Sequence, residues 1–188
     1  TVSDGNGGSD SQTINVTVTD TNDVAPVITS NEGGPTASVS IAENSTLVTT
    51  VTASDPDTVG TLLYSLAGGA DAALFAIDPE TGVLSFIAPP DYEAPGDAGE
   101  DNVYEVTVAV SDGNGGTDTQ TINVTVTDTN DVAPVITSNE GGPTASVSLA
   151  ENSTLVTTVT ASDPDTVGTL VYSLAGGADA ALFAIDPE

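Results

Sequence analysis

The sequence predicts an all-β protein made of tandem seven-stranded β-sandwich repeats of the immunoglobulin-like type. Short segments alternate between apolar and polar residues, and clusters of Gly, Pro, Asp and Asn separate them. No segment sustains the 3.6-residue apolar period of an amphipathic helix. Seven such segments in about 100 residues have the size and rhythm of an immunoglobulin-like sandwich.

The clearest predicted strand lies at residues 12–19, which read QTINVTVT. Ile14, Val16 and Val18 share one face and polar residues occupy the other, as in a half-buried strand. Residues 120–127 have the same sequence and therefore the same prediction. The other expected strands are residues 38–41, 47–53, 62–66, 74–77, 83–87 and 103–110. Aromatic residues are scarce, and those expected in the core are Tyr64, Phe75, Phe86 and Tyr104.

An internal repeat with a period of 108 residues organises the chain. Residues 1–80 match residues 109–188 at all but five positions, and none of the five changes removes a carboxylate. Such near identity indicates duplicated units of a longer array. We expect the end of a preceding repeat at 1–19, a linker at 20–26, a complete repeat at 27–127, a linker at 128–134, and the N-terminal part of a following repeat at 135–188.

The composition excludes most catalytic and nucleic-acid-binding functions. The 188 residues include 28 Asp or Glu and no Lys, Arg, His, Cys, Met or Trp, so the formal net charge is −28. Without His or Cys there is no imidazole base, no His-activated nucleophile and no thiolate zinc site. Phosphate backbones would repel this charge, and no apolar run approaches the ~18 residues that cross a bilayer. We therefore expect no enzyme, no nucleic-acid partner and no membrane insertion in this segment.

The carboxylates gather in short motifs between the predicted strands. In chain order the motifs of one repeat are AEN, SDPD, DYE, SDG and DTND, with the segment FAIDPETG between the second and third. This order resembles that of the cadherin repeat, and it is similar to the cadherin-like tandem repeats of large bacterial surface proteins or adhesins. The resemblance extends over the whole chain.

The resemblance implies that Ca²⁺ binds between consecutive repeats, so that both linkers are calcium linkers. At the junction after the complete repeat, it implies the ligands Glu43, Asp91, Glu93, Asp128, Asn130, Asp131, Asp163 and Asp165. At the junction before it, the ligands present are Asp20, Asn22, Asp23, Asp55, Asp57 and Asp112. The linkers depart from the family pattern at Val24 and Val132, which stand where a second Asn is usual.

Electrostatics favours the same ion independently. Converging carboxylates repel each other by roughly 4 kcal/mol per close pair at an effective dielectric constant near 20, and the chain has no cationic side chain to offset this. Ca²⁺ takes about 6 to 8 oxygen ligands in flexible, carboxylate-rich sites, whereas softer metals prefer nitrogen or sulfur. The acidic residues outside the motifs are expected to be solvated surface: Asp71, Asp78, Asp97, Glu100 and Asp101.

These observations predict a calcium-rigidified spacer of a secreted adhesin or extracellular fibre that mediates cell adhesion or matrix formation. The expected location is secreted or at the cell surface. Partners would be neighbouring repeats of the same chain, like chains in a fibre, or cell-surface glycans. The alternative is a calcium-dependent polysaccharide-binding module, although the sequence shows no exposed aromatic platform for a sugar.

Overall fold

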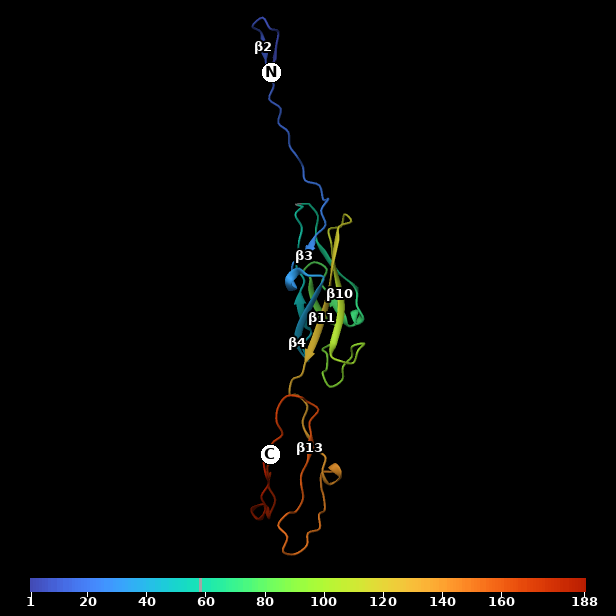
Figure 1. Cartoon of the computed structure of the whole chain (residues 1–188), viewed down its shortest axis with the longest axis vertical. Helices are drawn as coiled ribbons and strands as arrows, with labels where there is room; N and C mark the ends of the chain where they lie inside the picture. Colours follow the sequence, from blue (N-terminus) through green and yellow to red (C-terminus); the bar gives the residue numbers. More distant parts are fainter. Residues whose placement is uncertain (58) are drawn as a thin grey trace.

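The computed structural model describes residues 1–57 and 59–188. Figure 1 shows an elongated chain with one complete β-sandwich in its middle. The N-terminal residues form a small hairpin of β1 (Val2–Ser3) and β2 (Ser9–Asp10), and an extended stretch joins this hairpin to the sandwich. The described residues contain strands and short 3₁₀ turns but no α-helix. The prediction of an all-β fold is confirmed.

The larger sheet of the sandwich has four strands in the order β4–β11–β10–β7. They are β4 (Thr36–Ala42), β11 (Thr117–Thr127), β10 (Val103–Ser111) and β7 (Leu63–Gly68). Strand β10 is antiparallel to both of its neighbours, whereas β11 and β4 run parallel, with Thr121 opposite Thr36 and Thr127 opposite Ala42. The parallel pair brings the ends of β4 and β11 to the same pole of the sandwich.

The smaller sheet has three strands in the order β5–β9–β8. They are β5 (Leu47–Thr50), β9 (Val83–Phe86) and β8 (Phe75–Ile77). A separate ladder joins β3 (Val27–Ile28) to β6 (Ala53–Ser54), so the single strand predicted at residues 47–53 is in fact two strands with different partners. Two 3₁₀ turns complete the unit, η1 (Asn31–Gly33) and η2 (Ala72–Leu74).

The core lies between the two sheets and is formed by alternate residues of their strands. From β10 and β11 come Tyr104, Val106, Val108, Val110, Ile122, Val124 and Val126, and from the smaller sheet Val48, Phe75, Leu84 and Phe86. Each buried valine or leucine contributes about 1.5–3 kcal/mol relative to exposure. The rings of Phe75, Phe86 and Tyr104 pack together, with Phe86 and Tyr104 edge to face at 5.0 Å between centroids. The fourth expected core aromatic, Tyr64, is half-buried and packs against the hydrophobic core.

Residues 12–19 do not form the predicted strand. The side chains of Ile14, Val16 and Val18 are 73%, 79% and 91% exposed, and no ladder includes these residues. Their copy at residues 120–127 lies between β10 and β4. Residues 12–19 have no such neighbours in this chain, and a lone strand cannot bury its apolar face or pair its backbone.

The third copy of the repeat also forms few strands. Its elements are β12 (Val135–Ile136), β13 (Ala161–Ser162) and the 3₁₀ turns η3 (Asn139–Gly141) and η4 (Ala180–Leu182). Strands β12 and β13 pair as their counterparts β3 and β6 do. The counterparts of β4, β5, β7 and β8 form no strands among the described residues, because residues 135–188 do not include counterparts of β9, β10 and β11 for them to pair with.

Candidate metal centre

The end of β4 places a buried carboxylate at the pole of the sandwich. Glu43 directly follows β4 and is 3% exposed. Its Oε2 atom accepts the Tyr92 N–H at 2.8 Å, and its Oε1 atom accepts the Thr129 N–H at 2.8 Å and the Thr129 hydroxyl at 3.1 Å. Burial raises the pKa of Glu43, but the hydrogen bonds from Tyr92 and Thr129 outweigh it and hold the pKa below its usual range. The side chain therefore stays ionised at neutral pH.

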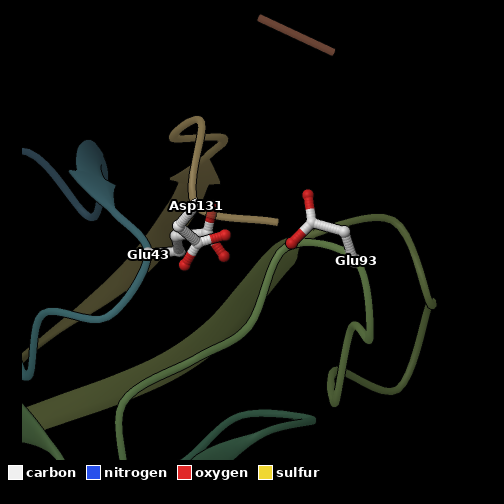
Figure 2. Close-up of side chains that lie close together, drawn as sticks. All are labelled: Glu43, Glu93 and Asp131. Carbon is white, nitrogen blue, oxygen red and sulfur yellow. The ribbon is translucent and has the colours of Figure 1, made fainter. Parts of the chain in front are cut away.

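Glu43 links two segments that carry further acidic residues. Tyr92 lies in the loop between β9 and β10 (residues 87–102, here called the acidic loop), and Thr129 lies in the linker that follows β11. The loop brings Glu93 and the linker brings Asp131 into one group with Glu43, with one carboxylate oxygen of each within 4.8 Å of the others. Figure 2 shows Glu43 and Asp131 close together and Glu93 facing them from the acidic loop.

A second group joins the acidic loop to the third copy. It consists of Glu93, Asp128 and Asp165, again with oxygens within 4.8 Å of one another. Asp165 follows β13, and its Oδ2 atom accepts the Val132 N–H at 3.0 Å. The Oδ2 atom of Asp128 accepts short hydrogen bonds from the backbone N–H and the hydroxyl of Thr166. Glu93 belongs to both groups, so the two groups are adjacent.

Three oxygens of the second group have no hydrogen-bond partner. Glu93 Oε1, Asp128 Oδ1 and Asp165 Oδ1 are buried and unpaired within the part of the chain that the structure describes. Burial, together with the charges of Glu43, Asp128 and Asp165, raises the pKa of Glu93 to about 7. Because an unpaired buried carboxylate oxygen is costly, a cation between these residues is the simplest way to satisfy them. The donors are all oxygens, which suits Ca²⁺.

Three other predicted ligands of this junction are not among the carboxylates of the two groups. Asp91 is exposed, and its Oδ1 atom accepts the N–H groups of Glu93 and Ala94, so it shapes the turn of the acidic loop. Asp163 accepts the Asp165 N–H at 3.3 Å. The Asn130 amide donates to the Val167 carbonyl at 3.1 Å. These three residues support the local geometry around the groups.

The junction before the sandwich repeats part of this arrangement. The Asn22 amide donates to the Val59 carbonyl at 3.1 Å, as Asn130 does to Val167. Asp57 Oδ2 accepts the N–H groups of Asp23 and Val24, both at 2.8 Å, and Asp55 Oδ1 accepts the Asp57 N–H at 2.9 Å. The Asn22 Oδ1 atom is buried without a partner among the described residues. Among the described residues, no group of three carboxylates forms at this junction; the positions equivalent to Glu43 and Glu93 in the preceding repeat lie outside residues 1–188.

The remaining predicted ligands of this first junction are Asp20 and Asp112. Asp112 is 4% exposed and its Oδ1 atom accepts the N–H groups of Asn114 and Gly116, so it orders the SDGNGG turn. Gly60 lies beside it with a φ of 107°, and a Cβ there would lie 2.6 Å from the Asn22 amide and 3.2 Å from the Asp112 carbonyl. Asp20 is exposed in the extended stretch. The glycine requirement at Gly60 was not anticipated from the sequence.

The expectation that Asp71 and Asp97 are solvated was wrong. They are 5% and 4% exposed. Asp71 accepts the N–H groups of Ala98 and Glu105 at 2.7 and 2.8 Å, and Asp97 accepts those of Gly99, Asp101 and Asn102. The signal available in the sequence was the Asp-Ala-Gly spacing at residues 97–99, which is typical of a tight turn closed by an Asp side chain.

No helical segment of the described chain is long and apolar enough to span a membrane.

Comparison with known proteins supports the reading of the fold. Residues 37–127 match the model of the cadherin domain family. Among curated proteins, the chain is 36% identical to rabbit (Oryctolagus cuniculus) Cadherin-16 over 163 residues, which are 81% of this chain and 19% of that protein. It is 34% identical to human Protocadherin Fat 1 over 185 residues, which are 93% of this chain and 4% of that protein. The chain therefore spans only a small part of these relatives.

Solved structures show the same likeness. The extracellular domain of Protocadherin GammaB4 superimposes with a TM-score of 0.66 and 26% identity, over 89% of this chain and 28% of that one. Mouse Cadherin-23 EC22-24 gives a TM-score of 0.58 and 28% identity, over 85% of this chain and 50% of that one.

Proposed function

Residues 37–127 are a cadherin domain, and on that premise we propose that the chain is a calcium-rigidified spacer of a secreted adhesin or extracellular fibre. Cadherin domains are extracellular, calcium-binding adhesion modules rather than enzymes, which agrees with a chain that lacks His, Cys and Lys. The proposed units are the complete repeat at 27–127, its two calcium linkers at 20–26 and 128–134, and parts of neighbouring repeats on either side.

The observation that carries the proposal is the group Glu93, Asp128 and Asp165. These residues come from the acidic loop, the linker and the following repeat, and each presents a buried oxygen without a partner among the residues described. Bound Ca²⁺ would neutralise these carboxylates and connect the three segments. With Glu43 and Asp131 alongside, the proposed ligand shell spans both sides of the linker. The remaining predicted ligands, at both junctions, are proposed to complete the shells or to support them.

Repulsion between the junction carboxylates links Ca²⁺ binding to the stiffness of the linker. At neutral pH and without a cation, the carboxylates at this pole repel one another, and the chain has no Lys or Arg to relieve the repulsion. The linker then bends freely. The affinity expected of extracellular calcium modules is on the order of 10⁻⁴ to 10⁻³ M, so the stiff form would develop after export.

The near identity of the copies supports a repetitive surface protein in which length is added by whole units. We propose a large bacterial surface protein or adhesin as its setting, on the strength of the repeat pattern in the sequence. The proposed contacts are with neighbouring repeats of the same chain and with like chains in a fibre.

The test is a calorimetric Ca²⁺ titration and a melting curve of the full chain, for the unmodified protein and two variants. Glu93→Gln removes a carboxylate shared by both groups, whereas Glu80→Gln removes an exposed charge in the turn between β8 and β9, at the other end of β9 from the acidic loop. We expect the unmodified chain and Glu80→Gln to bind Ca²⁺ and to melt at a higher temperature with it. Glu93→Gln should lose at least roughly tenfold in affinity. An absence of Ca²⁺ binding to the unmodified chain would overturn the proposal.

A further inference from the structure

The acidic loop carries Glu93 but has no regular secondary structure of its own between β9 and β10. A metal site gains affinity when its ligands are held in place before the ion arrives, because the ion then does not have to order the loop. In this structure the acidic loop is held by hydrogen bonds to its backbone, and two of them involve the N–H and the carbonyl of Tyr92.

The Tyr92 backbone is held from both sides. Its N–H donates to Glu43 Oε2 at 2.8 Å, and its carbonyl accepts the side-chain amide of Asn102 at 3.0 Å. Because Tyr92 directly precedes Glu93, fixing this backbone fixes the direction in which the Glu93 side chain leaves the loop. Glu43 is one of the clustered carboxylates itself, whereas Asn102 carries no carboxylate and reaches the loop through its side-chain N–H.

Asn102 is in turn anchored to the body of the sandwich. Its carbonyl accepts the Val126 N–H of β11 at 2.9 Å, and its own N–H donates to Asp97 Oδ1 at 3.0 Å. Val126 lies two residues before Asp128, at the point where β11 leads into the linker. Asn102 therefore connects the backbone beside Glu93 to the strand that delivers Asp128.

The far end of the acidic loop is also fixed without a cation. Asp97 accepts three backbone N–H groups within the loop, and Asp71 joins Ala98 of the loop to Glu105 of β10. The Tyr104 hydroxyl accepts the Gly96 N–H at 3.1 Å. All of these acceptors lie in the complete repeat, so the anchoring does not depend on the following one.

We infer that Asn102 is a positioning residue of the proposed calcium site, which holds Glu93 toward Asp128 and Asp165 through the carbonyl of Tyr92. The inference rests on the proposed function. Asn102 has a φ of 62°, a left-handed conformation that asparagine and glycine adopt readily and most other residues do not. The position therefore combines a backbone requirement with a side-chain hydrogen bond, and the two can be separated by mutation.

The first variant is Asn102→Gly in the full chain, because glycine keeps the left-handed backbone and removes only the amide. Its matched control is Glu100→Gly, which changes an exposed residue of the same loop with a φ of 53° and leaves the Tyr92 contact intact. Asn102→Gly should bind Ca²⁺ roughly tenfold more weakly, as for the loss of an outer hydrogen bond at a metal site. Glu100→Gly should stay within about twofold of the unmodified chain, as expected of a surface change away from the site.

The second variant, Asn102→Asp, separates the effect of the lost hydrogen bond on Ca²⁺ affinity from the effect of added charge. Asp tolerates the same backbone conformation but cannot donate to the Tyr92 carbonyl, and it adds a negative charge near the site. Charge alone predicts tighter Ca²⁺ binding, whereas loss of the hydrogen bond predicts weaker binding. We expect weaker binding, measured by calorimetry, with a far-ultraviolet circular dichroism spectrum like that of the unmodified chain.

The outcomes are distinguishable. If the unmodified chain and Glu100→Gly bind Ca²⁺ but Asn102→Gly and Asn102→Asp bind it equally well or better, the positioning role of Asn102 is overturned and the proposed function stands. If the unmodified chain binds no Ca²⁺, the proposed function is overturned and this inference falls with it. If Asn102→Gly does not fold, the Ca²⁺ affinity of Asn102→Asp tests the positioning role: weaker binding supports it, and equal or tighter binding overturns it.

Discussion

Residues 120–127 and residues 12–19 have the same eight-residue sequence but different structures. In the complete repeat the segment lies between β10 and β4, and Ile122, Val124 and Val126 are at most 1% exposed. In the N-terminal segment the identical residues are extended and their apolar side chains are largely exposed. Strand formation in this protein therefore depends on neighbouring strands more than on local preference.

The two junctions differ in the same way. The junction after the sandwich has Glu43 and Glu93 from the complete repeat, and it forms two groups of carboxylates. For the junction before it, residues 1–188 include the matching linker and the matching Asp55 and Asp57, but not the positions equivalent to the two glutamates. A linker and a following repeat alone do not assemble such a group. Residues 108 positions apart occupy equivalent places in the two copies, so mutating both gives matched pairs of variants.

The largest difference is expected for the pair Ile122→Ala and Ile14→Ala. Ile122 is fully buried between the sheets, so its truncation should lower the free energy of unfolding by about 2–5 kcal/mol. Ile14 is 73% exposed, and its truncation should change that free energy by less than about 0.5 kcal/mol. Urea unfolding followed by circular dichroism measures both. Equal effects would mean that residues 12–19 are packed in solution.

A smaller difference is expected for the pair Asp165→Asn and Asp57→Asn in calcium binding. Asp165 has a buried, unpaired oxygen beside Glu93 and Asp128, so losing its charge should weaken the tightest Ca²⁺ binding at least roughly tenfold. Asp57 lies at the junction that lacks the two glutamates, so its change should leave the tightest binding unaltered. Calorimetric titration of both variants tests this, and a stronger effect of Asp57→Asn would contradict the assignment of the complete site.

The smallest expected effect is on how the stability of the fold depends on pH. Burial raises the pKa of Asp97, but the N–H groups of Asp101, Asn102 and Gly99 outweigh it and hold the pKa below its usual value of 3.8. A carboxyl whose pKa is lower in the folded state stabilises that state above the unfolded pKa, and this stabilisation is lost as pH falls through the folded pKa. Acid titrations in calcium-free buffer should show less loss of stability below about pH 4 in Asp97→Asn than in the unmodified chain. An unchanged acid transition would show that Asp97 does not contribute to it.

The sequence predicted the long strands best. The alternation within residues 103–110 and 120–127 reflects a buried face, and β10 and β11 follow it. The two-residue strand β3 and the parallel pairing of β11 with β4 were not predicted, because neither leaves a local pattern. The error at residues 12–19 has the same origin, since a pattern cannot reveal whether a partner strand is present.

The sequence pointed to acidic residues that the structure brings together, but not to the residues that hold them in place. The resemblance to cadherin repeats pointed to Glu43, Glu93, Asp128, Asp131 and Asp165, which the structure brings into two groups. Asp71 and Asp97 were expected in solvent because an acidic residue in a loop is usually exposed. Their burial depends on N–H donors that only the folded acidic loop and β10 supply.

Carboxylates from both sides of the linker are proposed to share cations that stiffen the junction. Small-angle X-ray scattering of the full chain, in Ca²⁺ and then in excess chelator, tests it most directly when Glu93→Gln and Glu80→Gln are measured alongside. We predict a larger maximum dimension with Ca²⁺ for the unmodified chain and for Glu80→Gln, and little change for Glu93→Gln. An unmodified chain with the same dimensions in Ca²⁺ and in chelator would contradict the account.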